Sequence, residues 1–219
     1  MLAPIFNAAQ SQPLRRQVSG VQPQVLGEVL RDQVNLAVWQ RPLPAPVTGF
    51  AAQLLARGEP LAQSIGLEIQ DETVEPELGD LLAGYAALPG QTAFLADVRW
   101  LVSAFACLLG ARSIGLRLRV LDKAMCPRFH VDQVAVRLIT SYAGVGSEWL
   151  REDAMARQSL GDSAAEPRDA ASIERAGTGH VLLAKGEKWS GNQGGGLIHR
   201  SPQPPDGQRR LLLTLDWLA

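Results

Sequence analysis

The chain has 219 residues, 46% of them hydrophobic, and its 21 basic and 22 acidic side chains leave a formal net charge of -1. A chain of this length and composition can bury a sizeable core within one large domain. The near-neutral balance gives no general electrostatic attraction to nucleic acid or to a membrane surface. We therefore expect a small-molecule or protein substrate rather than either of those partners.

The first 24 residues are rich in Gln, Pro and Ser without a sustained period, which is typical of a mobile arm. The start of the chain lacks a basic segment followed by an apolar run of the signal-peptide type. The two cysteines, Cys107 and Cys126, are too few for a disulfide framework. These features predict a reducing compartment and a cytoplasmic location.

Residues 25–110 are expected to form a mainly helical N-terminal part. Helical patterns cover residues 25–32, 49–57, 77–87 and 92–109, with one strand pattern at 34–39. Residues 92–109 are apolar enough to suggest a membrane span, but Asp97 and Arg99 lie in the interior of the segment. These charges favour a buried helix of a soluble protein, ended by Gly110.

After Gly110 the hydrophobic pattern changes to the alternation that is typical of strands. Strands are expected at residues 113–121, 131–142, 147–150, 181–184, 196–199 and 210–217. Residues 151–179, in contrast, are polar and rich in Ala, Asp and Glu, which indicates an insertion that covers or flanks the mouth of a barrel. Both a lid over the substrate and a surface loop without function fit this composition. The fold class is α+β, with the helical part packed on a β-rich region at 111–219.

His130, Asp132 and His199 are the candidate metal ligands. Residues two apart on a strand point to one face, so His130 and Asp132 can bind one ion. His199 follows a Gly-rich approach and precedes a Pro turn, as expected for a short strand that supplies a third ligand. Two histidines and one carboxylate on one face of Fe(II) leave three positions for substrate and dioxygen.

This motif, followed by Arg210 on the last strand, resembles the Fe(II)/2-oxoglutarate dioxygenase superfamily. The resemblance implies a double-stranded β-helix (a jelly-roll or cupin-like barrel) for residues 111–219, with Fe(II) and 2-oxoglutarate as cofactors. It also implies that Arg210 binds the distal carboxylate of the oxo acid, for which a guanidinium is well shaped. One departure is Leu212, because many members of the superfamily have Ser or Thr at this position.

The strings CPRFHVDQVAVRLITSYAGVGSEWL and VLLAKGEKWSGNQGGGLIHRSPQPPDGQRRLLLTLDW are more closely similar to one bacterial family. That family is known only as domain of unknown function number 1826. Some of its members are encoded beside zinc-chaperone GTPases, which implies a functional link to those proteins. The resemblance indicates the fold more than any reaction.

Five further residues are candidates for roles around the metal. Thr140 and Tyr142 share the strand parity of the His130-x-Asp132 pair and are expected to face the same cavity, where Tyr142 either bonds the oxo acid or packs as a core aromatic. The remaining three, expected in the second shell or as structural residues, are Cys126, Arg209 and His180.

Two functions follow from these residues. The first is an Fe(II)/2-oxoglutarate-dependent oxygenase of hydroxylase type. The alternative is a barrel that binds metal without turnover, as in zinc handling or sensing, because neutral imidazole and carboxylate also suit Zn(II) and Zn(II) binds such sites more tightly than Fe(II).

Overall fold

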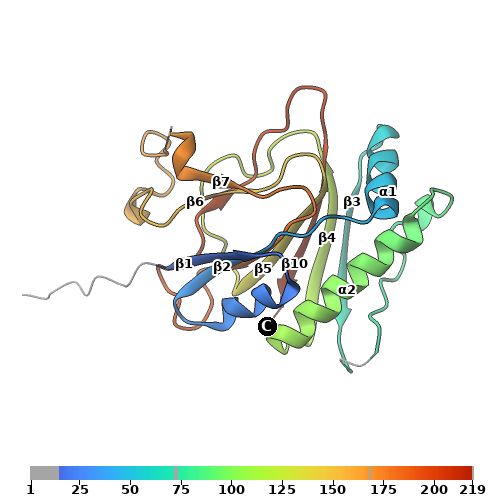
Figure 1. The fold of residues 1–219 in the computed structure, drawn as a ribbon, viewed down its shortest axis with the longest axis horizontal. Helices are drawn as coiled ribbons and strands as arrows, with labels where there is room; N and C mark the ends of the chain where they lie inside the picture. The colour runs from blue at the N-terminus through green and yellow to red at the C-terminus, as the bar shows by residue number, and fades with distance from the viewer. Residues whose placement is uncertain (1–14, 72–73, 168, 219) are drawn as a thin grey trace, which may run out of the picture.

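The protein, described here by a computed structural model, is built on two β-sheets (Figure 1). The structure describes residues 15–71, 74–167 and 169–218. The large sheet has the strand order β1 (Arg16–Gly20), β2 (Val34–Trp39), β8 (Val181–Lys185), β5 (Val136–Ala143), β10 (Arg210–Trp217), β4 (Ser113–Leu121) and β3 (Ala62–Glu68). The small sheet has the order β7 (Ile173–Arg175), β6 (Glu148–Leu150) and β9 (His199–Arg200). All pairs are antiparallel except β1 with β2.

Two α-helices, α1 (Ala45–Ala56) and α2 (Gln91–Leu109), lie along one face of the large sheet (Figure 1). Proline in the first turn of α1 suits a helix start, and Gly110 ends α2 in the left-handed conformation with φ 62°. Short 3-10 helices complete the described elements: η1 (Pro23–Leu30), η2 (Ala83–Tyr85), η3 (Arg157–Ser159) and η4 (Ala170–Ser172). The sequence therefore predicted both α-helices, with α1 starting earlier than expected.

The large sheet has an apolar core on each face. On the helix face, Phe50 and Phe94 pack against strand residues such as Leu116. On the other face, a second core lies between the two sheets and joins Ile139 of β5 to Trp149 of β6. Because both faces of the central strands are buried, β8 and β10 are almost continuous apolar runs.

From β4 onward the chain passes repeatedly between the sheets. Strands β5, β8 and β10 join the large sheet, whereas β6, β7 and β9 form the small one. Each sheet keeps two open edges, so the expected closed barrel is wrong in this respect: the result is a mixed α/β structure with two facing, open sheets.

The N-terminal region differs from the mainly helical prediction. It supplies strands β2 and β3, and residues 77–87 contain turns and the short η2 rather than an α-helix. Residues 16–20 of the predicted mobile arm form strand β1, while residues 1–14 lie outside the described residues. The strands β1 and β3 are edge strands with polar or small residues, so their alternation is weak in sequence.

Helix α2 is long and apolar enough to cross a membrane by length and composition alone. In the structure, its residues Phe94, Val98 and Phe105 are buried in the core between the helices and the large sheet. This packing agrees with the predicted core helix of a soluble protein.

Asp97, whose charge argued against a membrane span, joins α2 to the sheet. Arg41 donates two hydrogen bonds to its carboxylate, at 2.6 and 2.8 Å, and the Tyr142 hydroxyl donates a third at 2.6 Å. Burial and the neighbouring Asp97 charge raise the pKa of Tyr142 well above its ordinary value, so the phenol stays protonated as the donor. A buried, fully bonded network of this kind fixes how the helix sits on β5.

Replacing Tyr142 with Phe should lower the free energy of unfolding by about 2 kcal/mol, because a hydrogen bond to a buried charged group is lost. Chemical denaturation measures this change. Tyr85→Phe is the matched control, since the Tyr85 hydroxyl contacts Glu59 in an exposed setting. Unchanged stability together with weaker oxo acid binding would contradict this prediction. It would indicate that Tyr142 faces the ligand cavity, as the sequence analysis proposed.

Candidate metal centre

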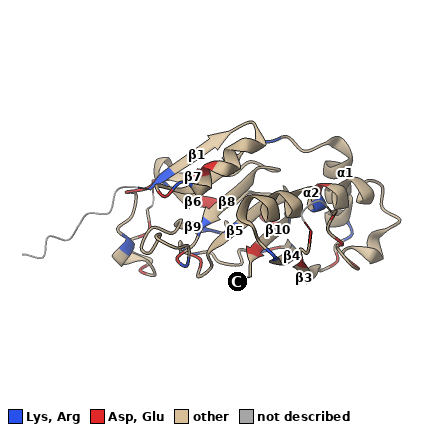
Figure 2. Ribbon diagram, turned by 90° about the horizontal axis from the view of Figure 1, so that it is seen from below, with Lys and Arg blue, Asp and Glu red and all other residues tan. Residues whose placement is uncertain are grey.

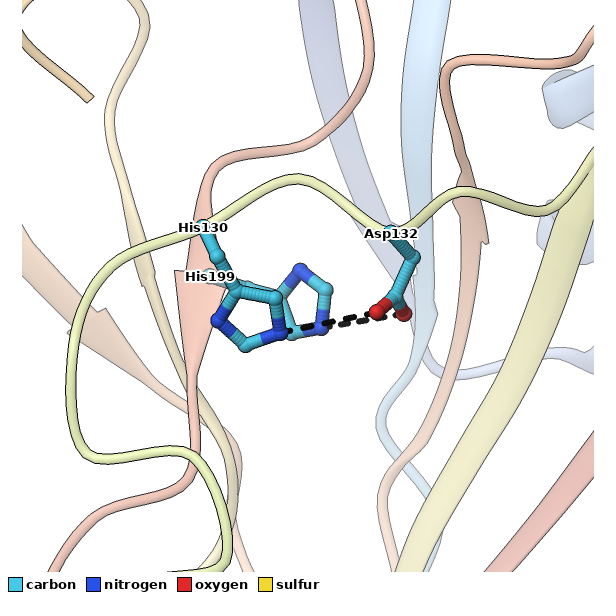
Figure 3. Close-up of side chains that lie close together, drawn as sticks. All are labelled: His130, Asp132 and His199. Carbon is cyan, nitrogen blue, oxygen red and sulfur yellow. Dashed lines mark ion pairs between the residues drawn. The ribbon is translucent and has the colours of Figure 1, made fainter. Parts of the chain in front are cut away.

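The backbones of His130 and His199 pair with each other, which brings the two imidazoles together. Each amide N–H donates to the carbonyl of the other residue at 3.0 Å, an isolated antiparallel bridge at the edge of the small sheet. Directly opposed residues of an antiparallel pair point to the same face. The two ring centres are accordingly 4.6 Å apart (Figure 3).

Hydrogen bonds to the backbone leave one nitrogen of each imidazole available. Nδ1 of His130 lies 2.9 Å from the carbonyl oxygen of Arg128, and Nδ1 of His199 lies 3.2 Å from that of Leu197. A carbonyl oxygen can only accept, so each Nδ1 carries the proton and each Nε2 keeps a lone pair. This is the tautomer in which metal-binding histidines are held by a second-shell acceptor.

Asp132 completes the set from an irregular segment between β4 and β5. Its carboxylate oxygens lie 3.5 Å from Nε2 of His130 and 3.3 Å from Nε2 of His199 (Figure 3). One ligand atom from each of the three residues lies within 4.8 Å of the others. The three predicted ligand candidates therefore converge, although residues 131–135 are not part of a strand, contrary to the predicted strand at 131–142.

Two glycines allow this convergence by close approach of the backbone. The Asp132 carbonyl accepts the Glu187 N–H at 2.9 Å, and a Cβ on Gly186 would lie 2.2 Å from the Val134 oxygen. A Cβ on Gly196 would lie 2.3 Å from a methyl carbon of Val131. The Gly-rich approach to His199 thus serves the close packing expected from the sequence.

The charge on Asp132 is balanced by Arg137, a residue that the sequence analysis missed. Arg137 donates to Asp132 Oδ2 at 2.7 Å and also bonds Asp216 of β10, which in turn pairs with Arg117 of β4. The available signal was Asp216, an acidic residue in a mostly apolar strand, because a buried carboxylate needs a cationic partner.

The pKa shifts follow from these contacts. Burial raises the pKa of Asp132, but the contacts with His130 and His199 and the charge of Arg137 outweigh it and hold that pKa well below its usual range. The contact with Asp132 raises the pKa of His130, against the opposing effect of burial. The carboxylate is therefore ionised over the physiological pH range and attracts a cation.

Arg210 lines the same small cavity as His130 and His199 and is 1% exposed. Its guanidinium donates to the hydroxyls of Ser141 at 2.9 Å, Ser201 at 3.1 Å and Ser147 at 2.6 Å. Among the described residues no carboxylate forms a salt bridge with it. Burial lowers the pKa of Arg210 to about 10, although the charge of Glu148 opposes this shift.

The serines around Arg210 compensate for the departure noted at Leu212. Leu212 does line the cavity, but the hydroxyls come from β5, from the segment before β6 and from the segment after β9. Sequence spacing relative to Arg210 could not reveal them, because they are brought in by other strands.

Thr140 and Tyr142 lie elsewhere than predicted. Tyr142 is fully buried in the core on the helix face, beside Phe94, and Thr140 points to the same side by strand alternation. The inner face of β5 instead carries Arg137 and Ile139, which line the cavity. The prediction was wrong because the irregular segment after Asp132 shifts the alternation of β5 by one residue.

The other candidates lie at three different places. Cys126 lines the metal cavity and its carbonyl accepts the Ser201 N–H at 2.9 Å. Arg209 points to the helix face, where it donates to the Leu55 carbonyl. His180 lines a different cavity, away from the metal ligands.

Part of the polar insertion packs behind the histidines. Phe129 and Ile198, which immediately precede the two histidines, point to the outer side of the small sheet and form an apolar cluster with Met155 of the insertion. Glu166 accepts the Phe129 N–H at 3.2 Å. In this part the insertion supports the ligand-bearing segment from behind, whereas its residues 151–153, 174 and 175 flank a separate cavity between the sheets.

Comparison with known families gives a match over most of the chain. A model described as "Protein of unknown function (DUF1826)" matches residues 20–216. The chain belongs to this family. No curated protein matches it.

Three solved structures are similar to this member of the DUF1826 family over most of its length. A prolyl-4-hydroxylase from Pseudomonas putida has a TM-score of 0.45 and 14% identity, covering 88% of this chain and 96% of its own. AviO1 from Streptomyces viridochromogenes has a TM-score of 0.46 and 14% identity, covering 92% and 97%. The dioxygenase for auxin oxidation 1 from Arabidopsis thaliana, in a complex with 2-oxoglutarate, has a TM-score of 0.46 and 10% identity, covering 94% and 93%.

Replacing Arg137 with Met should weaken divalent metal binding about 10- to 100-fold, because the Asp132 carboxylate loses the group that orients it. Competition between the protein and a chromophoric chelator for Zn(II) measures the affinity. Arg117→Met is the matched control, because Arg117 pairs with Asp216 without contacting Asp132. Equal losses in the two variants would mean that Arg137 acts only through Asp216.

Replacing Glu166 with Ala should weaken metal binding roughly tenfold, because the Phe129 N–H loses its acceptor and the His130 segment loses that support. Metal binding should in turn slow hydrogen exchange of insertion residues 151–167, because coupling between two sites is reciprocal. Glu174→Ala is the control, because Glu174 is an exposed residue of β7. Equal hydrogen-exchange rates with and without bound metal would contradict this coupling.

Proposed function

We propose that the protein is an Fe(II)- and 2-oxoglutarate-dependent oxygenase of the hydroxylase type. Two Nε2 atoms and one carboxylate converge on one point, and their donor set fits Fe(II) with positions left for other ligands. The repeated passage of the chain between two facing sheets supports a jelly-roll of the double-stranded β-helix kind.

The buried guanidinium of Arg210 is the observation that carries this proposal. A buried cation without a carboxylate partner is unfavourable unless a ligand supplies the opposite charge. Arg210 has five N–H donors in a planar fork, and three serine hydroxyls occupy part of them. The far carboxylate of an oxo acid bound at the metal would complete both the charge and the hydrogen bonds.

The roles of the residues follow from this arrangement. His130, Asp132 and His199 would hold Fe(II), and Arg210 would hold the distal end of 2-oxoglutarate. Arg137 orients the Asp132 carboxylate through its 2.7 Å hydrogen bond. Bound iron and oxo acid supply the oxidation by dioxygen, while the protein positions the reactants and limits access of water.

A cytoplasmic location is part of the same proposal. Both Cys107 and Cys126 are free thiols, as expected in a reducing compartment. Figure 2 shows basic and acidic residues interspersed along the ribbon. The formal net charge of -1 likewise gives no general electrostatic attraction to nucleic acid or anionic lipid.

The alternative is a zinc-handling or zinc-sensing protein, linked to zinc-chaperone GTPases. The same three side chains suit Zn(II), which binds mixed nitrogen and oxygen sites more tightly than Fe(II). This function needs no oxo acid and therefore leaves the buried charge of Arg210 without a purpose.

The deciding experiment is anaerobic addition of Fe(II) and 2-oxoglutarate, followed by visible absorption for the charge-transfer band of a chelated oxo acid. We expect a band in the native protein and none in His199→Ala. In Arg210→Met, half-saturation should need at least about 30-fold more oxo acid. The reason is that truncating one partner of a buried charge pair costs about 2–5 kcal/mol. Arg209→Met, on the opposite face of the strand, should behave like the native protein.

Metal analysis of protein purified without chelators separates the two functions. Stoichiometric zinc together with no band after iron loading would overturn the oxygenase proposal in favour of metal handling. If the band appears with equal oxo acid affinity in the native and Arg210→Met proteins, Arg210 does not bind the oxo acid. The three metal ligands would still be supported by that result.

A further inference from the structure

A second cavity, of about 500 Å³, lies between the sheets at the end formed by β1, β2 and the small-sheet strands β6 and β7. It shares no lining residue with the cavity of the metal ligands. The cavity is partly open to solvent, and its volume falls in the range of small-molecule pockets, roughly 300–1,000 Å³. We call it the β1–β7 chamber, and the proposed oxygenase chemistry does not use it.

One wall of the chamber is apolar. Leu36 and Val38 of β2 and the indole of Trp149 line it, and all three belong to the buried core between the sheets. A flat or branched apolar group can pack against this wall and remove its surface from water. The wall gives a ligand a small apolar contact surface beside the polar lining of the chamber.

Trp149 also brings an unused polar atom to this wall. The residue is 8% exposed, and its Nε1 is buried without a hydrogen-bond partner among the described residues. Buried N–H groups in folded proteins nearly always have an acceptor, because an unpaired one is destabilising. A ligand in the chamber is the natural source of that acceptor.

His180, in the turn before β8, adds a second donor. The Gly177 N–H donates to His180 Nδ1 at 3.1 Å, so the neutral imidazole carries its proton on Nε2. Burial lowers the pKa of His180, which favours this neutral form. Two N–H donors in one chamber match a ligand that is rich in acceptor atoms.

Equal numbers of basic and acidic side chains line the chamber. Three arginines and three carboxylates line it: Arg15, Arg151, Arg175, Glu152, Asp153 and Glu174. With no excess of either sign, the chamber offers no net attraction to a strongly charged molecule. The wall and the donors thus favour an uncharged ligand.

We propose that the β1–β7 chamber is a second ligand site, which takes an uncharged molecule with an apolar ring or branched body and a carbonyl acceptor. The body packs on Leu36, Val38 and the Trp149 ring, and the carbonyl oxygen accepts the Trp149 Nε1–H. Strand pairing places Trp149 directly opposite His199, so an occupied chamber lies one strand away from the metal site without being part of it.

The test uses ¹⁵N-labelled, metal-free protein and a panel of aromatic amides, each beside its carboxylate and its hydrocarbon counterpart. The chain has five tryptophans, and Trp149→Phe identifies the indole N–H resonance of Trp149 by its loss. We expect the amides to shift this resonance and to bind more tightly than either counterpart. Trp149→Phe, which keeps an aromatic ring without the donor, should bind them at least about tenfold more weakly.

Two further variants keep the test decisive. Trp189→Phe is the control, because Trp189 packs on the helix face of the large sheet and should leave amide binding unchanged. Ser19→Phe fills the chamber from an exposed position of β1 and should abolish binding without disturbing the core.

Three results would overturn the proposal. These are a Trp149 resonance that no amide shifts, amide affinities that are equal in the native and Trp149→Phe proteins, and carboxylates that bind better than the amides. Because the measurement needs neither metal nor oxo acid, its outcome is independent of the oxygenase proposal.

Discussion

The backbone pairing of His130 with His199 is the constraint on which the candidate metal site depends. Neither segment has extensive regular structure: β9 comprises only His199 and Arg200, and His130 forms only an isolated bridge. Two backbone hydrogen bonds at 3.0 Å nevertheless fix the separation and direction of both imidazoles. The apolar cluster around Phe129 and Ile198 supports this bridge from outside, because side chains alternate between the two faces.

The buried charged residues differ in whether they have a partner of opposite charge, and this difference separates their roles. Asp132, Arg137 and Asp216 satisfy one another within the protein, with Arg117 completing the chain of ion pairs. Arg210 has hydroxyl partners only. A protein can keep such a charge buried only with good hydrogen bonds, and it gains stability when a carboxylate arrives, because the ligand binds the folded state alone.

The amino-acid sequence was sufficient for residue types that are rare and specific. With three histidines in the chain, the His-x-Asp spacing and a distant His identified a convergent set, and strand parity separated Arg210 from Arg209 correctly. Parity failed for Tyr142, because alternation can be carried along a chain only while the strand is unbroken, and residues 131–135 break it. The role of residues 151–172 was hidden for another reason. Their composition is polar overall, and the few apolar residues that matter, such as Met155, gain meaning only from the segment they contact.

The position of strand β10 constrains the order in which the strands of the large sheet can pair. It follows every other strand in the chain, yet it lies in the interior of the large sheet, between β5 and β4. Until β10 is inserted, β4 and β3 form a separate ribbon, and the cavity of the metal ligands lacks Arg210. Such pairing of distant segments makes folding slow compared with locally connected folds. Without β10, the strands of the large sheet fall into two sets, and each set has an additional open edge of the kind that can pair with other chains.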